Sequence, residues 1–183
     1  REGKEWDKIE GLKLNIDQFN SIIKSNPLYK SNRELSDRIE VNPFYEISIS
    51  KNISTQEAFG KIMNEIGKVN NSITKRIVTT SPDVTVSTSL GGWVNKKNIF
   101  STHRKKDIFG EKKVYSAQKW KYLPDGQHIE LGIAENNLFL LLASLGISDK
   151  LFGTRLLPIG TIYDTFIGRG LDALNYATYI DAR

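Results

Sequence analysis

The stretch between residues 128 and 146 constrains the fold of this chain more than any other. His-Ile-Glu-Leu-Gly at 128–132 has the composition of a short strand, and a helical segment at 134–145 follows it almost directly. That segment is apolar at nearly every position and stops at Gly146. A helix that is apolar all round must be buried on most of its sides, so we expect it at the centre of a layered domain or at a subunit interface.

Helix and strand patterns alternate along the rest of the chain. A Ser-x-x-Glu capping box at Ser54 starts the best-defined helix. The further expected elements are that helix (54–67), a strand (76–79), a second β-rich stretch (83–87), a strand (156–159) and a final helix (165–180). This order predicts an α/β fold with a mainly parallel sheet flanked by helices, whose ligand-binding groups lie at the carboxyl ends of the strands.

The first fifty residues differ in composition from the rest. They are polar and broken by Pro27 and Pro43, with one short amphipathic piece at 16–23 that Asn15 or Asp17 can cap. We interpret residues 1–50 as a connecting arm from a preceding domain and residues 51–183 as the domain itself. The sequence has no cysteine and no run of ~20 apolar residues, which argues against disulfides and membrane spans and favours a cytoplasmic protein.

Positive charge is concentrated in one segment. Residues 96–121 contain nine Lys or Arg against two acidic residues, in a chain whose net charge is +5. The segment also contains glycine and serine, and we interpret it as a long, solvated, exposed loop. Because the remainder of the chain carries no excess of positive charge, nucleic acid is not an expected partner. A patch for a polyanion or an acidic partner stays open as the alternative.

Glu135 is the carboxylate that most needs an explanation. It stands at the beginning of the apolar helix, directly after the predicted strand. An acid in this place can simply complement the helix dipole, which stabilises a helix by ~0.3–1 kcal/mol. The residues alone leave this structural reading and a catalytic one open.

The segment around Glu135 resembles a known motif. Gly-Ile-Ala-Glu at 132–135, between a strand and an apolar helix, is similar to the glutamate motif of the transketolase and 2-oxo acid dehydrogenase E1 family of thiamine-diphosphate enzymes. Downstream, the segment 157–166 resembles the family segment whose two aromatics, here Tyr163 and Phe166, line the aminopyrimidine pocket. The resemblance implies the pyrimidine-binding domain of such an enzyme.

The resemblance continues upstream and covers residues 51–183. The helix at 54–67 is similar to the first helix of that domain, and 81–90 is similar to the loop that reaches the cofactor from the first strand. The amino-acid sequences of residues 127–137 and 169–175 are most similar to those of the homodimeric pyruvate dehydrogenase E1 branch.

The resemblance also implies residue roles. In the family, the glutamate at the position of Glu135 bonds N1′ of the aminopyrimidine and shares a proton with it, which activates the cofactor to form the C2 ylid. Phe166 would supply a flat apolar face for the pyrimidine, with Tyr163 beside it. Both aromatics would also fit an ordinary core. Asp83 and Ser87 correspond to loop positions near the cofactor.

Three other titratable residues are weaker candidates. Glu130 would lie in or at the end of a half-buried strand. His128 could approach a bound substrate, but a structural role is favoured. His103 lies in the basic segment, where a surface position is expected.

The metal half of the family site has no counterpart here. The family holds Mg²⁺ and the diphosphate through a Gly-Asp-Gly motif in a separate domain, and this sequence contains no Gly-Asp-Gly. We therefore expect no metal ligand in this chain and Mg²⁺ bound by a domain outside it. The family domain also continues beyond the residue matching Arg183, so we expect its C-terminal part to be missing.

The expected function follows from the resemblance. It is decarboxylation of a 2-oxo acid, pyruvate in the first instance, with transfer of the acyl group to a lipoyl-bearing E2 protein. The implied partners are a 2-oxo acid, a second copy of the chain across the cofactor site, and E2. Two alternatives stay open, namely another reaction of the superfamily, such as transketolase-type ketol transfer or 1-deoxyxylulose-phosphate synthesis, and a non-enzymatic polyanion-binding module that uses residues 96–121.

Overall fold

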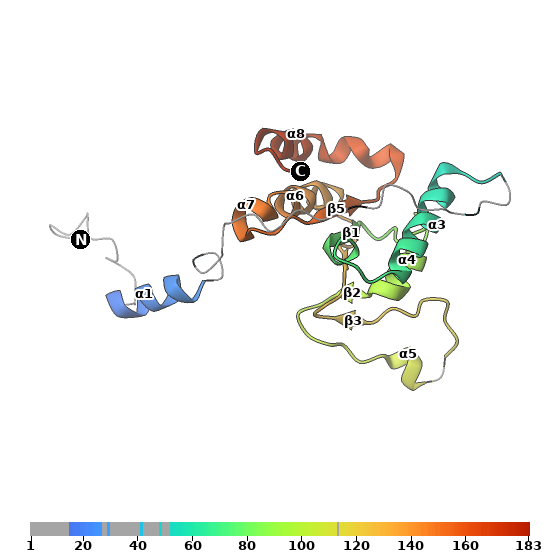
Figure 1. The fold of residues 1–183 in the computed structure, drawn as a ribbon, viewed down its shortest axis with the longest axis horizontal. Coiled ribbons are helices and arrows are strands. Elements are labelled where there is room, and N and C mark those ends of the chain that lie inside the picture. Colours follow the sequence, from blue (N-terminus) through green and yellow to red (C-terminus); the bar gives the residue numbers. More distant parts are fainter. Residues whose placement is uncertain (1–14, 27–28, 30–40, 42–47, 49–51, 113) are drawn as a thin grey trace.

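The computed structural model describes residues 15–26, 29, 41, 48, 52–112 and 114–183 (Figure 1). Its sheet has five strands, all parallel, in the order β3-β2-β4-β1-β5. The strands are β1 (Ile77–Ser81), β2 (Ile99–Phe100), β3 (Tyr122–Leu123), β4 (His128–Glu130) and β5 (Leu157–Gly160). The predicted α/β fold with a parallel sheet flanked by helices is confirmed.

Helices precede, connect and follow the strands. The α-helices are α1 (Ile16–Ser25), α3 (Thr55–Lys68), α4 (Gly91–Lys97), α5 (Ile108–Glu111), α6 (Glu135–Gly146), α7 (Ser148–Phe152) and α8 (Leu171–Tyr179). The described residues also form the 3-10 helices η1 (Thr74–Arg76) and η2 (Asp164–Gly170). Within the described ranges, no helix combines the length and the apolar character needed to cross a membrane.

The predicted helix starts at Ser54 and Asn15 are confirmed. The Ser54 hydroxyl accepts a hydrogen bond from the Glu57 amide at 3.1 Å, and the Glu57 carboxylate accepts one from the Ser54 amide at 3.0 Å. These reciprocal bonds satisfy amides that the first turn of α3 cannot pair internally. Asn15 and Gln18 make the same reciprocal pair at the start of α1, so Asn15 rather than Asp17 is the cap.

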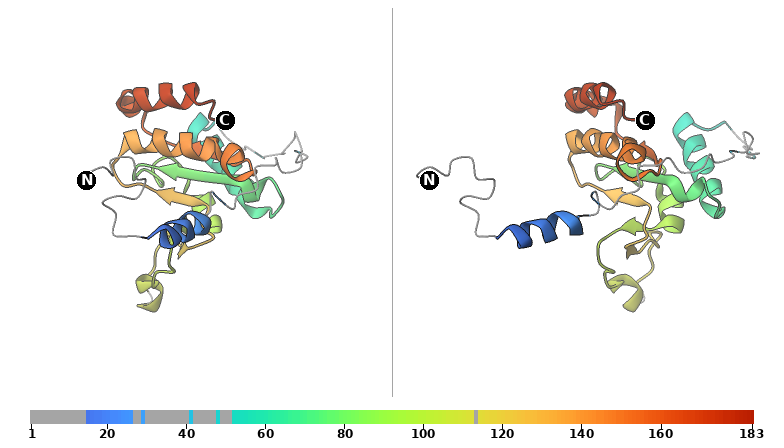
Figure 2. Two further views of the ribbon diagram at one scale, coloured as in Figure 1. Left: turned by 90° about the vertical axis from the view of Figure 1, so that its left-hand side faces the viewer. Right: turned by 60° about the vertical axis from the view of Figure 1, so that its left-hand side comes forward.

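The two faces of the sheet carry different helices. Ile77 of β1 and Ile159 of β5 pack in one core with Trp93 of α4. On the opposite face, a Cβ built on Gly160 would stand 2.7 Å from a methyl carbon of Leu142 in α6. Because Ile159 and Gly160 are neighbours in one strand and point to opposite faces, α4 and α6 lie on opposite sides of the sheet. Figure 2 shows α8 covering α6 from outside.

Burial of α6 is less complete than the sequence predicts. Leu138, Phe139 and Ala143 are buried, but Leu140 is 43% exposed. The sheet and α8 cover two sides of this helix, and the side bearing Leu140 has no neighbouring element that buries it among the described residues. The helix is therefore central to the layer without being enclosed by it.

The prediction of a second β-rich stretch at 83–87 is wrong. The backbone leaves the extended conformation directly after β1, where Asp83 has a φ of 61°. The chain then coils, and both the amide and the hydroxyl of Thr88 bond to the Val84 carbonyl, at 2.9 and 2.8 Å. Serine and threonine hydroxyls favour such local bonds over a strand ladder. We call residues 83–88 the β1 turn.

The predicted final helix at 165–180 begins later than expected. Residues 164–170 form the 3-10 helix η2, and the α-helix starts at Leu171. Gly168 and Gly170 weaken α-helix formation in this stretch. Gly170 also lies so close to α6 that an added Cβ would overlap the ring of Phe139. The glycine thus allows η2 and α6 to approach closely, which no helical periodicity could indicate.

The segment at 96–121 is more structured than the predicted loop. Lys96 and Lys97 end α4, β2 follows at 99–100, and α5 lies at 108–111. Ile99 is 4% exposed and anchors β2 between β3 and β4. His103 is exposed, as expected. Residues 101–107 and 114–121 have no regular secondary structure and are mostly exposed, so these parts of the segment match the predicted exposed loop.

We predict that Gly170→Ala lowers the free energy of unfolding by ~1–3 kcal/mol, because the new methyl group would collide with Phe139, which is 8% exposed and tightly packed. Gly168→Ala is the matched control, since a Cβ there meets no atom within 4 Å. Urea denaturation of both variants measures the difference. Equal effects at the two positions would contradict the close packing of η2 on α6.

Candidate functional site

The predicted site residues follow the carboxyl ends of three adjacent strands. Asp83 and Ser87 come after β1, Glu135 after β4, and Tyr163 and Phe166 after β5. The chain leaves β1 toward α4 on one face of the sheet and leaves β4 and β5 toward α6, η2 and α8 on the other. In α/β proteins with a parallel sheet, ligands bind at the carboxyl edge where the chain diverges in this way.

Glu135 is buried at the first residue of α6 and paired with a single arginine. Its side chain is 9% exposed, and its Oε1 accepts a hydrogen bond from Nη1 of Arg169 at 2.6 Å. The N-cap of α6 is Ala134, and no side chain caps this helix end. The carboxylate is thus turned toward η2 and away from the helix amides.

A continuous set of contacts runs from Arg169 to the β1 turn. The guanidinium carbon of Arg169 lies 4.1 Å from the centre of the Phe166 ring. The centroids of the Phe166 and Tyr163 rings are 6.1 Å apart, and the planes of the two rings make an angle of 48°. The Tyr163 hydroxyl donates to Ser87 Oγ at 2.7 Å. We call Glu135, Arg169, Phe166, Tyr163 and Ser87 the Glu135 cluster, and it joins four of the five predicted site residues.

Sequence reasoning missed Arg169. It lies three residues beyond Phe166, a spacing that places two side chains on one side of a helical segment. That spacing could have indicated the contact with the aromatic ring. The pairing with Glu135, 34 positions away in the sequence, depends on how η2 packs against α6 and had no local signal.

Asp83 does not join the Glu135 cluster and belongs to a second group of residues. Its side chain is exposed, and its backbone amide donates to Glu130 Oε1 at 2.8 Å. The structure therefore places Asp83 beside Glu130, the acid that ends β4.

The second group surrounds a fully buried histidine. His128 is 0% exposed, with Nδ1 at 2.9 Å from Thr79 Oγ1 and Nε2 at 2.9 Å from Thr85 Oγ1. Thr85 Oγ1 donates to Glu130 Oε2 at 2.6 Å and lies 2.7 Å from Ser81 Oγ. Strand register explains the assembly, because Thr79 pairs with His128 and Ser81 with Glu130. We call Thr79, Ser81, Thr85, His128 and Glu130 the His128 cluster.

The surroundings of Glu130 act on its acidity in opposite directions. Burial raises the pKa of this carboxyl, but hydrogen bonds from His128, Thr85 and the Asp83 amide lower it more, so that its pKa lies below the ordinary value of 4.5. Glu130 is therefore a carboxylate at neutral pH. Its two short bonds, from the Thr85 hydroxyl at 2.6 Å and the Asp83 amide at 2.8 Å, hold the charge in place.

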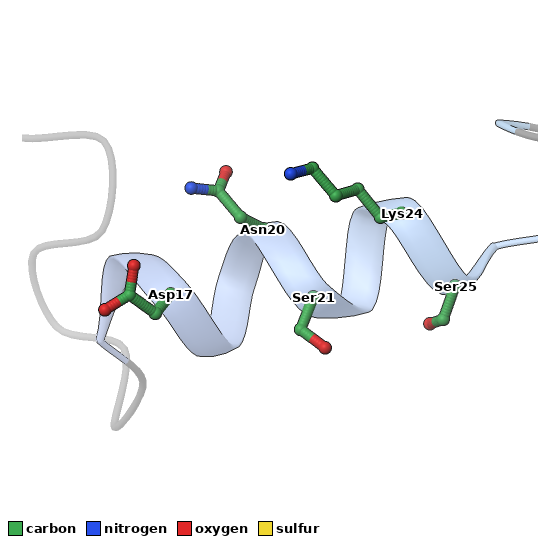
Figure 3. Close-up of a pocket in the computed structure, with 5 residues that line it drawn as sticks. All are labelled: Asp17, Asn20, Ser21, Lys24 and Ser25. Carbon is green, nitrogen blue, oxygen red and sulfur yellow. The ribbon is translucent and has the colours of Figure 1, made fainter.

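One hollow of the structure lies on a single exposed helix. A space of about 500 Å³ along α1 is lined by Asp17, Asn20, Ser21, Lys24 and Ser25 (Figure 3). All of them are exposed and come from one helix. In the described part of the chain, no other element closes this space, and we assign it no function. Likewise, no group of three or more His, Asp or Glu residues that could hold a metal ion occurs in that part.

Comparison with known proteins identifies no family for the chain. No family model matches it, and no curated protein matches its sequence. The function must therefore be argued from the residues of the site.

We predict that stability falls as pH drops through the pKa of Glu130, because a group whose pKa is lowered by folding stabilises the protein above its unfolded pKa and loses this effect once protonated. The window lies below about 4.5, the ordinary value for a glutamate. Urea unfolding between neutral pH and pH ~3 should show a smaller loss in Glu130→Gln than in the wild type. An identical loss in both would contradict the role of this carboxylate.

Proposed function

We propose that this chain forms the pyrimidine-binding part of a thiamine-diphosphate enzyme that decarboxylates a 2-oxo acid, pyruvate in the first instance, and passes the acyl group to a lipoyl-bearing E2 protein. The observation that carries the proposal is the Glu135 cluster. It combines a buried carboxylate, the face of one aromatic ring and a second aromatic ring that bears a hydroxyl, at the carboxyl edge of a parallel sheet. The resemblance of residues 51–183 to that enzyme family adds the choice of chemistry.

The residues of the Glu135 cluster fit a flat, nitrogen-bearing ring. The guanidinium of Arg169 is itself planar and rich in nitrogen. It donates to Glu135 and lies over the Phe166 ring. A planar group in the place of the guanidinium would bond the carboxylate with its edge and meet the aromatic ring with its face. An aminopyrimidine has the same two features.

Arg169 must move for any ligand to enter this space. Its side chain is 55% exposed, whereas that of Glu135 is 9% exposed. Solvent can therefore stabilise the guanidinium after it leaves, while Glu135 stays in place at the start of α6. The burial of the carboxylate favours a replacement partner that again donates a hydrogen bond.

In the proposed reaction, this chain contributes one acid and a binding surface. Thiamine diphosphate, when bound, supplies the carbon nucleophile that attacks the 2-oxo group. Glu135 holds a proton at the ring nitrogen of the pyrimidine, and Phe166 orients the ring. Tyr163, whose hydroxyl is held by Ser87, fixes the side of the pocket nearest the β1 turn. Mg²⁺ and the diphosphate would be held by a domain outside these residues.

Exposed apolar side chains support the proposal of a second copy beside the site. Ile133, immediately before α6, is 80% exposed, Leu140 of α6 is 43% exposed, and Tyr179 of α8 is 86% exposed. A second copy of the chain packed on α6 and α8 would cover these side chains. We therefore propose that α6 and α8 contribute to a homodimer whose site is completed by the other copy.

A transketolase-type ketol transfer would use the same cluster. The roles of Glu135 and Phe166 concern cofactor activation, which all of these reactions share, so the cluster does not select the substrate. Assay of pyruvate against a ketose phosphate donor separates the two reactions.

A second candidate function is polyanion binding at the basic segment. A cavity of about 460 Å³ there is lined by Lys105, Lys106, Asp107, Ser116, Gln118, Lys119, Trp120, Lys121 and Tyr122. The ammonium of Lys105 lies 4.5 Å from the centre of the Tyr122 ring. Lysines and aromatic rings in one cavity can hold an anionic ligand with a flat group.

If polyanion binding is the function, affinity for a single-stranded oligonucleotide should fall steeply between roughly 50 and 200 mM salt, because bound counterions are released on association. The combined change Lys105→Gln and Lys121→Gln should weaken it, while Glu135→Gln should leave it unchanged. Fluorescence anisotropy measures all three. Absence of binding at low salt would exclude this candidate.

We predict that Glu135→Gln leaves the natural protein folded and able to bind thiamine diphosphate with Mg²⁺, but lowers turnover of pyruvate at least ~100-fold, the loss typical when an acid or base is removed. Reduction of an artificial electron acceptor measures turnover, and proton exchange at C2 of the cofactor, followed by NMR, measures activation directly.

The control is Glu111→Gln, which makes the same chemical change at an exposed position in α5. Its turnover should stay within a factor of about two of the wild type, because a surface substitution of this kind changes little. If Glu135 only stabilises the start of α6, its replacement should cost ~0.3–1 kcal/mol of stability and leave C2 exchange intact. That result would contradict the proposed function.

A further inference from the structure

We propose that Glu130 is a positioning residue, and that a one-way hydrogen-bond relay from Thr79 through His128 and Thr85 to Glu130 fixes the β1 turn against the site. The inference rests on the proposed function only where it concerns the effect of the β1 turn on the cofactor site. The fixing of the turn itself follows from the hydrogen-bond geometry.

The direction of the relay follows from its donors and acceptors. Glu130 is a carboxylate and can only accept, so the 2.6 Å bond to Thr85 uses the one hydroxyl proton of Thr85. Thr85 Oγ1 must then accept from His128 Nε2, which lies 2.9 Å away and therefore carries the imidazole proton. The unprotonated Nδ1 accepts from the Thr79 hydroxyl, also at 2.9 Å.

Every polar side-chain atom of the relay is used, which makes the arrangement rigid. The opposite tautomer would require Thr85 to donate to His128, and its oxygen would then face the Glu130 carboxylate with no proton between them. His128, Thr79, Ser81 and Thr85 are all at most 5% exposed, so water cannot repair a lost bond easily. Buried networks that are fully satisfied hold one geometry.

The last residue of the relay, Glu130, binds the backbone of Asp83, which has a positive φ. Asp83 has a φ of 61°, a left-handed conformation that non-glycine residues adopt rarely. Glu130 Oε1 accepts a hydrogen bond from the Asp83 amide at 2.8 Å, and Oε2 accepts one from the Thr85 hydroxyl. One carboxylate therefore binds the turn at two points. A charged acceptor makes these bonds stronger than neutral ones.

The β1 turn connects the relay to the Glu135 cluster. Ser87 on this turn receives the hydrogen bond of Tyr163, and the Ser87 carbonyl accepts from Gln56 Nε2 at 3.1 Å. Thr88 Oγ1 lies 2.9 Å from Thr161 Oγ1, directly after β5. A shift of the turn would therefore displace Ser87 and, with it, the Tyr163 side of the proposed pocket.

Hydrogen exchange and NMR test the relay without any cofactor. In the wild type, nitrogen NMR of His128 should show the proton on Nε2. Exchange of the Asp83 amide should be about tenfold faster in Glu130→Gln, because a charged acceptor is lost. Thr85→Val should also accelerate it, and Thr85→Ser, which keeps the hydroxyl, should restore the wild-type rate. Glu135→Gln is the matched control and should leave this exchange unchanged.

Two results would overturn the inference: a His128 proton on Nδ1, or an Asp83 exchange rate that Glu130→Gln does not change. Should Glu130→Gln fail to fold, the wild-type tautomer and the Thr85 pair still decide the matter. In the natural protein, Glu130→Gln should raise the cofactor concentration for half-maximal activity about tenfold, whereas Glu135→Gln should lower kcat with cofactor bound. A wild type inactive on pyruvate would refute the proposed function and leave the exchange and tautomer results valid.

Discussion

The pairing of β1 with both β4 and β5 is the constraint on which the rest of this structure depends. Side chains of register partners in parallel strands point to the same face of a sheet. The register therefore sets the hydroxyls of Thr79 and Ser81 beside the imidazole and carboxylate of β4. On the other face, it sets Thr80 beside Gly160, the residue that allows α6 to approach. A shift by one residue would bury the polar set against α6.

Burial then determines how polar groups at this edge behave. Among the described residues, the indole nitrogen of Trp93 is the one buried side-chain nitrogen or oxygen without a hydrogen-bond partner. The His128 cluster meets the requirement for partners within itself and excludes water. The Glu135 cluster meets it through an arginine that is more than half exposed, so solvent can stabilise the guanidinium when another hydrogen-bond donor takes its place at Glu135. The first cluster is suited to hold a shape, and the second is suited to exchange partners.

Local patterns predicted the parts of this structure that depend on neighbouring residues. The capping box at Ser54, a cap at Asn15 or Asp17, the strand that begins at His128 and the apolar helix after it are all visible in the sequence, because each signal is local. The β1 turn was misread because its alternating Val and Thr match a strand, while the left-handed Asp83 depends on the distant carboxylate of Glu130. Arg169 was missed for the same reason, since packing of η2 on α6 creates its partner.

The two glutamates at the end of β4 illustrate how environment separates residues of one chemical type. Glu130 is held by the Thr85 hydroxyl and by the Asp83 amide, so loss of its charge would weaken both bonds to the β1 turn. Glu135, five residues later, has one recorded partner, whose side chain is more than half exposed. A carboxylate that shares a proton with a ligand must be able to give up its resting partner, and only Glu135 is placed to do so. The sequence Glu-Leu-Gly-Ile-Ala-Glu therefore puts a fixed support and an exchangeable acid on the same edge of the sheet.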